Sequence, residues 1–372
     1  MKFIILVENL RNILSLASSA LGKNVHLPIL ESFQIVAKGN AVTVSATNLE
    51  IGIVASCPAK VEKEGVAAVA ARPFLNFLQQ LNEAKAIVEQ KEKTVVVSTD
   101  SYTASLQTFE AGDFPLIPSV KSAVRLEMES ALFAQACEQV MFASSVSDLR
   151  PELNSVCFKY EGRDGIKFVA TDTFRLAEKT LAARDCLGLP EEKQSILVPL
   201  KTIQETARIA KEKLEPLVIT NDPTQVCFEW SDIKLISRLV EGEFPEYGSV
   251  IPDSFKLKTL VAHGKLLEAL KVSGVFSSRL HDVRFSFSQK EKTAVLLATD
   301  ALAGENRAAL RLDQCEGEPL EASFNYRYLI DVLGALNPKN KVIFNVADID
   351  RPALVQTEGD ATYFSIIMPL RI

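Results

Sequence analysis

Histidine is scarce in this chain of 372 residues, which has only His26, His263 and His281. None of the three stands at metal-ligand spacing from another His or a Glu, and none accompanies a Ser or Cys nucleophile motif. The patterns GxGxxG, GxxxxGK[ST] and HExxH are missing as well. These absences argue against a metal-dependent, nucleotide-binding or nucleophilic enzyme, and we expect no metal and no cofactor.

Closely spaced cysteines are also missing. The six cysteines are Cys57, Cys137, Cys157, Cys186, Cys227 and Cys315. No two lie within four positions of each other, so the sequence contains neither a zinc knuckle nor a CxxC redox pair. Because several lie in apolar runs, we expect buried, reduced thiols.

Long hydrophobic runs are absent too. No apolar run approaches the ~18 residues that span a bilayer. The first eight residues are too short and become charged too soon for a secretory signal, and they are more typical of an edge strand. The sequence therefore predicts a cytoplasmic protein with no membrane partner.

A surplus of basic residues is lacking, since the net charge is −6. Residues 124–252 carry 15 basic and 21 acidic groups, whereas the two outer thirds are balanced. A protein that binds DNA by neutralising many phosphates is usually basic. This composition argues against a conventional tight DNA binder but allows a protein that surrounds DNA and touches it lightly.

The chain does contain a threefold repeat. Thr47, Thr171 and Thr299 each follow a β-prone apolar run, at separations of 124 and 128 positions, and 124 is one third of the chain length. Pro245 lies 130 positions after Pro115 and 124 before Pro369. We therefore predict three similar domains in tandem, at residues 1–123, 124–252 and 253–372.

Each third contains two helix patterns and about eight short strands, which indicates an α+β fold with helices on one face of curved antiparallel sheets. The first helix of each third opens the unit with an apolar stripe: Leu10, Ile13, Leu14, Ala17 and Leu21; Leu132, Phe133, Ala136, Cys137, Val140 and Met141; Leu266, Leu267 and Leu270, continuing towards Val275. Apolar strand ends favour sheets that continue across domain boundaries. Curved repeats that close with symmetry form rings.

Two groups of polar residues remain to be interpreted. Asp172 and Asp300 follow the repeated Thr, where a side-chain oxygen can bond nearby backbone N–H groups and form a turn. An enzyme assembled from Asp172, Asp300 and Arg175 is the reading we rank last, because acid–base or two-metal chemistry needs paired carboxylates. Lys201, Arg208 and Lys211 share one helix face, which is either solvated or turned towards phosphates.

Several segments, in order along the full length, resemble the bacterial sliding clamp family, the β subunit of the replicative DNA polymerase III holoenzyme. They are residues 1–3, 27–30, 170–177, 244–245 and 368–372. The resemblance implies a head-to-tail, ring-shaped homodimer with helices lining the hole, which encircles duplex DNA without sequence preference and confers processivity without catalysis. It implies the replicative polymerase, a clamp-loading ATPase and other proteins with clamp-binding motifs as partners.

The resemblance also implies site residues. A partner-peptide pocket would comprise Leu153, Thr171, Thr173, Phe174, Arg175, Leu176, Pro245, Val250, Tyr328, Ile366, Met368, Pro369, Leu370 and Arg371. Residues facing DNA would be Lys23, Asn24, Arg150, Lys201, Arg208 and Lys211. The dimer interface would contain Leu106, Val275 and Phe276.

Thr173 and Phe174 replace the Gly-His that the family usually has, and we expect Phe174 to make the pocket floor more apolar. Residues 368–372 would fray at a free terminus unless something held them. The alternative function is a non-replicative ring scaffold that binds partner peptides without DNA.

Overall fold

The computed structural model describes residues 1–22, 27–120 and 124–371. The chain divides into two compact units. Unit 1 contains Met1–Ala131 and Arg208–Leu239, and unit 2 contains Leu132–Ala207 and Val240–Ile372.

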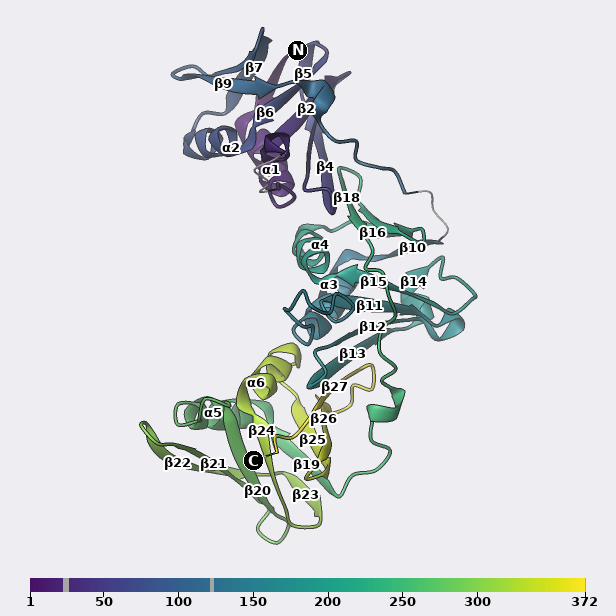
Figure 1. Ribbon diagram of the computed structural model, residues 1–372, viewed down its shortest axis with the longest axis vertical. Helices are drawn as coiled ribbons and strands as arrows, with labels where there is room; N and C mark the ends of the chain where they lie inside the picture. Colours follow the sequence, from purple (N-terminus) through teal and green to yellow (C-terminus); the bar gives the residue numbers. More distant parts are fainter. Residues whose placement is uncertain (23–26, 121–123, 372) are drawn as a thin grey trace. The chain divides into compact units, whose positions relative to one another are not determined.

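The predicted repeat is visible in the order of elements (Figure 1). Counted over the described residues, each repeat consists of a strand, a helix, five strands, a second helix and three strands. It therefore opens with a strand rather than a helix and has nine strands rather than about eight. The helices are α1 (Val7–Ser18), α2 (Ala71–Gln80), α3 (Ser130–Met141), α4 (Leu200–Glu212), α5 (His263–Gly274) and α6 (Tyr326–Ala335).

The strands of the first repeat are β1 (Lys2–Leu6), β2 (Ser32–Lys38), β3 (Ala41–Thr47), β4 (Ile51–Pro58), β5 (Lys60–Lys63), β6 (Gly65–Ala70), β7 (Lys85–Lys91), β8 (Thr94–Ser98) and β9 (Thr103–Phe109). Those of the second are β10 (Val124–Glu129), β11 (Ser155–Tyr160), β12 (Ile166–Thr171), β13 (Arg175–Leu181), β14 (Cys186–Leu187), β15 (Gln194–Pro199), β16 (Pro216–Asn221), β17 (Gln225–Glu229) and β18 (Ile233–Arg238). Those of the third are β19 (Leu257–Ala262), β20 (Asp282–Ser288), β21 (Thr293–Asp300), β22 (Gly304–Arg311), β23 (Gln314–Gly317), β24 (Leu320–Asn325), β25 (Lys341–Asp348), β26 (Arg351–Thr357) and β27 (Tyr363–Ile367).

In unit 1 the strands follow one another in the order β10-β16-β17-β18-β4-β3-β2-β6-β9-β8-β7-β1-β5. Strand β1 pairs with β7 on one side and with β5 on the other, so the prediction of an N-terminal edge strand was wrong. The alternating burial of residues 2–6 is consistent with both kinds of strand, and only the long-range partner β5 decides between them.

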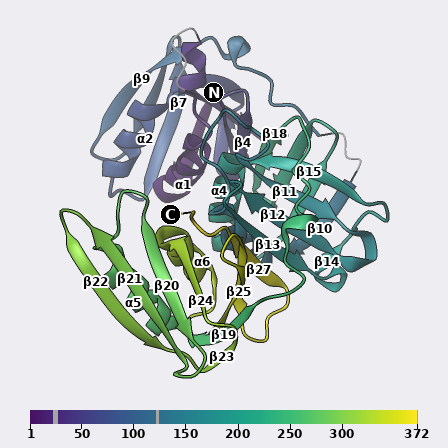
Figure 2. The ribbon, with the colours of Figure 1, turned by 60° about the horizontal axis from the view of Figure 1, so that its bottom comes forward.

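Unit 2 contains two sheets. One follows the order β15-β11-β12-β13-β27-β26-β25-β19-β23, and the other follows β22-β21-β20-β24. Helices α5 and α6 pack against each other and against the smaller sheet (Figure 2). Rings of Phe285, Phe324 and Phe344 meet at centroid distances of 5.5–5.9 Å in the core of the third repeat.

Sheets continue from one repeat into the next, as the apolar strand ends predicted. In unit 1, β18 of the second repeat pairs antiparallel with β4 of the first. In unit 2, β27 of the third repeat pairs antiparallel with β13 of the second. The middle repeat takes part in both pairings, and its residues are divided between the two units.

The apolar stripes form helix faces with two corrections at their ends. Leu10, Ile13, Leu14 and Ala17 are buried, but α1 ends at Ser18 and Leu21 lies outside it. Leu266 and Leu270 are buried, whereas Val275 follows the end of α5 and is 69% exposed. A stripe cannot continue past the residue at which the helix ends.

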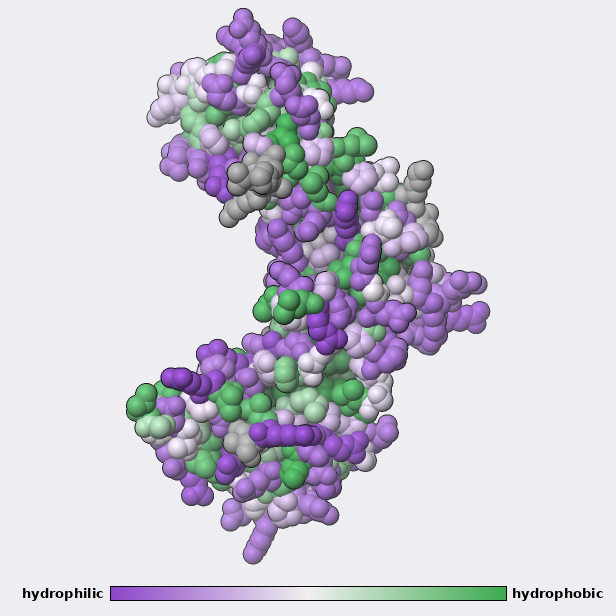
Figure 3. All heavy atoms as spheres, in the orientation of Figure 1, coloured by the Kyte–Doolittle hydropathy of each residue, from purple (hydrophilic) through white to green (hydrophobic). Residues whose placement is uncertain are grey.

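Five of the six cysteines are buried, and Cys57 is half-buried. Burial raises the pKa of the Cys157 thiol to about 12, which disfavours the reactive thiolate. Within residues 1–22, 27–120 and 124–371, no helix is long and apolar enough to cross a membrane. Hydrophilic side chains cover most of the surface visible in Figure 3, and hydrophobic ones form small patches among them.

Candidate functional site

The repeated Thr-Asx turn is built by side-chain hydrogen bonds, as predicted. Between β12 and β13, Asp172 accepts the N–H groups of Phe174 and Arg175, both at 2.9 Å. Thr171 Oγ1 accepts the N–H of Thr173 and donates to the carbonyl of Arg175. Asn48 and Thr47 make the equivalent bonds between β3 and β4.

The third residue of this turn has a left-handed backbone. Thr173 has φ +76°, and its counterpart Leu49 in the first repeat has φ +78°. Only glycine adopts this conformation without cost, so a β-branched threonine is strained here. A glycine at this position would avoid the strain.

A pocket of about 180 Å³ opens beside the turn in unit 2. Its lining residues come from the turn and β13, from the segment after β18, and from β27 and the residues that follow it. They are Thr171, Thr173, Phe174, Arg175, Leu176, Pro245, Glu246, Tyr247, Val250, Ile366 and Met368. Nine of these were predicted, and the structure brings them together from segments far apart in the sequence.

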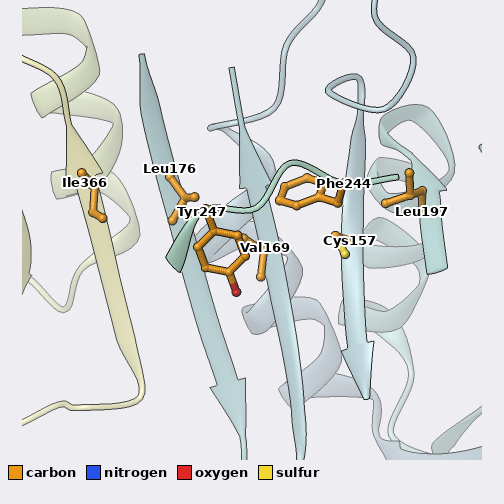
Figure 4. Close-up of a cluster of buried hydrophobic side chains, with 7 residues drawn as sticks. All are labelled: Cys157, Val169, Leu176, Leu197, Phe244, Tyr247 and Ile366. Atoms are coloured by element: carbon orange, nitrogen blue, oxygen red, sulfur yellow. The ribbon is translucent and has the colours of Figure 1, made fainter. Parts of the chain in front are cut away.

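Three of the lining residues, Leu176, Tyr247 and Ile366, belong to a buried apolar cluster, shown in Figure 4. It consists of Cys157, Val169, Leu176, Leu197, Phe244, Tyr247 and Ile366. Tyr247 donates a hydrogen bond to Glu178 Oε2 at 2.5 Å, and Glu178 also pairs with Lys167 at 3.0 Å. Burial and the neighbouring Glu178 raise the pKa of Tyr247, so its hydroxyl stays protonated and keeps this bond.

Arg175 extends from the pocket towards helix α6. Its side chain is only 11% exposed, and its guanidinium pairs with Asp172 at 3.1 Å and with Asp331 at 2.5 Å. The same group lies over the ring of Tyr328, 4.3 Å from the centroid. Tyr328 does not line the pocket but helps to fix Arg175, which does.

The chain end is held rather than frayed. The Met368 N–H donates to the carbonyl of Phe174 at 2.8 Å, and the Leu370 N–H donates to the carbonyl of Ser323 at 2.7 Å. These two bonds fix Met368 as one wall of the pocket. Pro369 is buried, Leu370 is half-buried and Arg371 is exposed, and none of the three lines the pocket.

Comparison with known proteins gives the family. Three models match in order: the N-terminal, central and C-terminal domains of the DNA polymerase III beta subunit, at residues 1–118, 127–246 and 248–371. The chain belongs to the DNA polymerase III beta subunit family. The α+β fold of three similar domains in tandem, predicted from the repeat, and the clamp fold implied by the resemblance are therefore confirmed.

Full-length relatives agree with this assignment. The chain is 27% identical over 379 residues to the beta sliding clamp of Synechococcus elongatus and 27% identical over 387 residues to that of Bacillus subtilis, with 100% of each chain covered. Among solved structures, the sliding clamp of Bacillus subtilis has a TM-score of 0.94 at 25% identity, and the beta subunit of Thermotoga maritima has 0.91 at 27%. Both comparisons cover 100% of this chain and 99% of the other.

Two lining residues, Glu246 and Tyr247, were missed by reasoning from the family pattern. Their position directly after Pro245, a predicted pocket residue, was the available signal. Leu153 was predicted but is buried away from the lining, where its backbone contacts Arg150 and Ser145. Phe174 is 58% exposed, so it lies at the rim and not, as expected, in the floor.

The predicted DNA-facing residues have different surroundings. Lys201, Arg208 and Lys211 are exposed on α4. Arg150 is exposed but pairs with Glu152 at 3.0 Å, which partly satisfies its charge. Lys23 and Asn24 lie outside the described residues.

The predicted interface residues differ in exposure. Val275 is 69% exposed and Phe276 is half-buried. Leu106 is only 8% exposed within β9, so its side chain packs inside its own unit and could contribute to an interface chiefly through the strand that carries it.

The carboxylates of the least favoured, enzymatic reading are engaged in turns. Asp172 bonds two backbone N–H groups and Arg175. The N–H groups of Ala303 and Leu302 bond Asp300 and lower the pKa of its carboxyl. Each carboxylate thus accepts hydrogen bonds from the backbone of its own turn, as the turn interpretation predicted.

Proposed function

We propose that this chain is a sliding clamp: two copies form a ring around duplex DNA and tether the replicative DNA polymerase, with no catalytic role. The full-length match to three clamp domains supports this function. The proposal keeps domain boundaries at residues 1–123, 124–252 and 253–372. It places the protein in the cytoplasm, with a clamp-loading ATPase and other clamp-binding proteins as further partners.

The proposed ring is supported mainly by a strand pairing that occurs twice between neighbouring repeats, which we call the joint between sheets. The last strand of one repeat pairs with the fourth strand of the repeat before it, as β18 with β4 and β27 with β13. Two equivalent strands take no part in these pairings: β9, the last strand of the first repeat, and β22, the fourth strand of the third. Strand β22 ends its sheet, and β9 pairs with β6 only through Thr108 and Phe109, leaving residues 103–107 paired on one side with β8.

The same joint can therefore form between two copies, with β9 of one against β22 of the other. Two such contacts related by symmetry give a closed, head-to-tail homodimer. Val275 and Phe276, which follow α5, would lie in this contact, and Leu106 would enter it as part of β9.

DNA contact would be weak and sequence-independent. Lys201, Arg208 and Lys211 provide positive charge on α4, and we propose that they face the phosphates together with Lys23, Asn24 and Arg150. The overall charge of −6 suits a protein that moves along DNA, because many phosphate contacts would hold it in place.

The small pocket would bind a partner peptide. Its apolar lining, fixed guanidinium and volume of about 180 Å³ suit one or two apolar anchor side chains of a short segment. Leu153, Tyr328, Pro369, Leu370 and Arg371 would support the lining or extend the contact.

Retention on circular DNA tests the clamp function. The protein is loaded onto nicked circular DNA with the clamp loader and ATP, and the circle is then cut at one site. We expect retention on the circle and loss after cutting, because a closed ring leaves only over a free end. Equal retention on both forms would indicate ordinary binding, and no retention on either would favour the scaffold without DNA.

A substitution in the pocket wall tests the peptide site. Val250 is 44% exposed and lines the pocket, so Val250→Glu places a charge there without disturbing the core. We expect at least about 10-fold weaker binding of a peptide that carries the clamp-binding motif of the polymerase catalytic subunit, measured by fluorescence anisotropy. Val146→Glu, at a residue that is 89% exposed and outside the pocket, is the control and should bind normally.

A further inference from the structure

The segment between β18 and β19 carries charge of mainly one sign. We call residues 240–256 the β18–β19 linker, and its carboxylates belong to Glu241, Glu243, Glu246 and Asp253. All four residues are exposed, and none of their carboxylates forms an ion pair or hydrogen bond with any residue in the described part of the chain. The basic residue of the linker, Lys256, is paired with Asp348 at 2.6 Å. The linker therefore presents unpaired negative charge to solvent.

Two of these carboxylates lie at the proposed peptide pocket. Glu246 is one of its lining residues. Along the linker, Phe244 and Tyr247 are buried in the apolar cluster of Figure 4, and the glutamate before each of them, Glu243 or Glu246, is exposed. The Cα atoms of Glu243 and the lining residue Pro245 are at most ~7 Å apart, because two residues of chain reach no further. That distance is below the Debye length of ~8 Å at physiological salt, so both charges act on a ligand in the pocket.

The cations on the neighbouring strands are engaged elsewhere. Arg175, the basic residue of the lining, pairs with two carboxylates outside the linker. Lys167 pairs with Glu178 at 3.0 Å, and the Lys159 ammonium lies over the ring of Tyr247, 4.4 Å from its centroid. None of these three cations pairs with a linker carboxylate. A cation from a bound partner can therefore approach the linker without displacing one of them.

We propose that the pocket favours partner segments in which a lysine or arginine flanks the apolar anchors. This inference rests on the proposed peptide site and specifies the class of peptide that the site prefers. The apolar lining would hold the anchors, and the flanking cation would lie near Glu243 and Glu246. Charges at the rim of an interface act on partner choice and on the rate of association, which is the effect expected here.

Three peptides that differ only at their ends test this preference. Each carries the clamp-binding motif of the polymerase catalytic subunit, extended at both ends by Gly and then by Lys, Gln or Glu. Fluorescence anisotropy with the full chain gives the three affinities at low salt. We expect the Lys peptide to bind about 3-fold tighter than the Gln peptide and the Glu peptide about 3-fold weaker, the scale of exposed charge pairs. The differences should shrink towards unity at about 1 M NaCl, where the Debye length is only ~3 Å.

A double variant identifies the carboxylates responsible. In Glu243→Gln/Glu246→Gln, the ratio of Lys-peptide to Glu-peptide affinity should fall from about 10-fold to near unity. The ratio cancels any change in affinity that all three peptides share. The matched control is Glu192→Gln, at an exposed carboxylate on the loop before β15, outside the lining. That loop meets the sheet at the opposite end of β12 from Thr171, so the control should keep the ratio of the unchanged chain.

The other outcomes contradict the inference. Equal affinities for the three peptides, or a ratio that the double variant leaves unaltered, would overturn the charge preference and leave the peptide site in place. Tighter binding of the Glu peptide would also overturn it and would implicate Arg371, which is exposed three positions after Met368. Failure of all three peptides to bind the unchanged chain would instead refute the proposed peptide site, and the inference with it.

Discussion

Arg175 is fixed more firmly than any single contact could achieve. Two carboxylates, Asp172 and Asp331, bond its guanidinium from different elements, and the ring of Tyr328 stacks on it. The planar guanidinium can satisfy these partners at once, whereas a lysine ammonium is a point charge that cannot stack in the same way. Arg175 thereby links the β12–β13 turn to helix α6 within unit 2.

Arg175→Lys should therefore destabilise the protein although it keeps the charge. We expect a loss of about 1–2 kcal/mol in the free energy of unfolding, because charge-assisted hydrogen bonds and stacking are both weakened. Urea unfolding followed by circular dichroism measures it. Arg184→Lys, at a side chain that is 88% exposed, is the control, and an equal effect at both positions would contradict the argument.

Thr173 presents the opposite situation, a residue whose backbone is strained. Thr173→Gly should raise the free energy of unfolding by about 0.5–1 kcal/mol, since the relief at φ +76° exceeds the extra entropy of glycine in the unfolded chain. Leu49→Gly tests the equivalent position with a side chain that is not β-branched, and its gain should be smaller. A loss of stability in Thr173→Gly, measured by urea unfolding, would show that the side chain contributes more than the strain costs.

The sequence predicts such local features better than long-range contacts. The Thr-Asx turns were predicted because their hydrogen bonds join residues only two to four positions apart. The pairing of Arg175 with Asp331, 156 positions away, depends on how β13 and α6 meet and leaves no local pattern. The bond between Tyr247 and Glu178, 69 positions away, leaves no local pattern either.

Among the elements, the tail after β27 is held by few bonds. Two backbone N–H groups, of Met368 and Leu370, fix it to Phe174 and Ser323. Such a segment opens more easily than a strand paired along its length. Its opening would remove Met368 from the pocket wall.

Leu370→Pro removes one of these donors and should loosen the tail. We expect the Met368 amide to exchange its hydrogen about 5-fold faster, which corresponds to the ~1 kcal/mol contributed by one hydrogen bond. Hydrogen–deuterium exchange read by NMR gives the rate. Arg371→Pro lies one position further, at an exposed residue, and should leave the rate unchanged; a similar acceleration in both variants would mean that the Ser323 bond does not hold the tail.

Element boundaries show a similar limit to prediction. The periodicity located α1 but not its end at Ser18, because Leu21 continues the apolar spacing beyond the last helical turn. The pattern of β1 indicated a strand, yet its place inside the sheet, next to the edge strand, follows from β5, some 60 residues later. Alternation along a strand reports which face is buried and not how many neighbours pair with it.

At the scale of the whole molecule, the repeat draws attention to strand edges that lack a partner in the part of one copy that the structure describes. Strands β4 and β13 receive the last strand of the following repeat, and β22 is the third member of their set. The proposed homodimer gives β22 the β9 strand of a second copy. Backbone N–H groups of β22 that point away from β21 would then bond across the interface.

Proline substitutions at two neighbouring residues test this interface. In an antiparallel strand, adjacent residues direct their N–H groups to opposite sides, so one of Ala308 and Ala309 faces β21 and the other faces the free edge. Of Ala308→Pro and Ala309→Pro, the inward-facing variant should lower the melting temperature of the subunit. The outward-facing variant should have nearly the melting temperature of the unchanged chain when both are compared as monomers. It should, however, weaken dimerisation at least about 10-fold in sedimentation equilibrium. The reason is that proline removes an N–H donor from the interface and blocks close approach of the partner strand. Glu316→Pro in β23, which ends the other sheet of unit 2 and has no role in the proposed contact, is the control for proline on an edge strand. Dimers of unchanged affinity in both alanine variants would exclude pairing of β9 with β22 and, with it, the head-to-tail ring built from this joint.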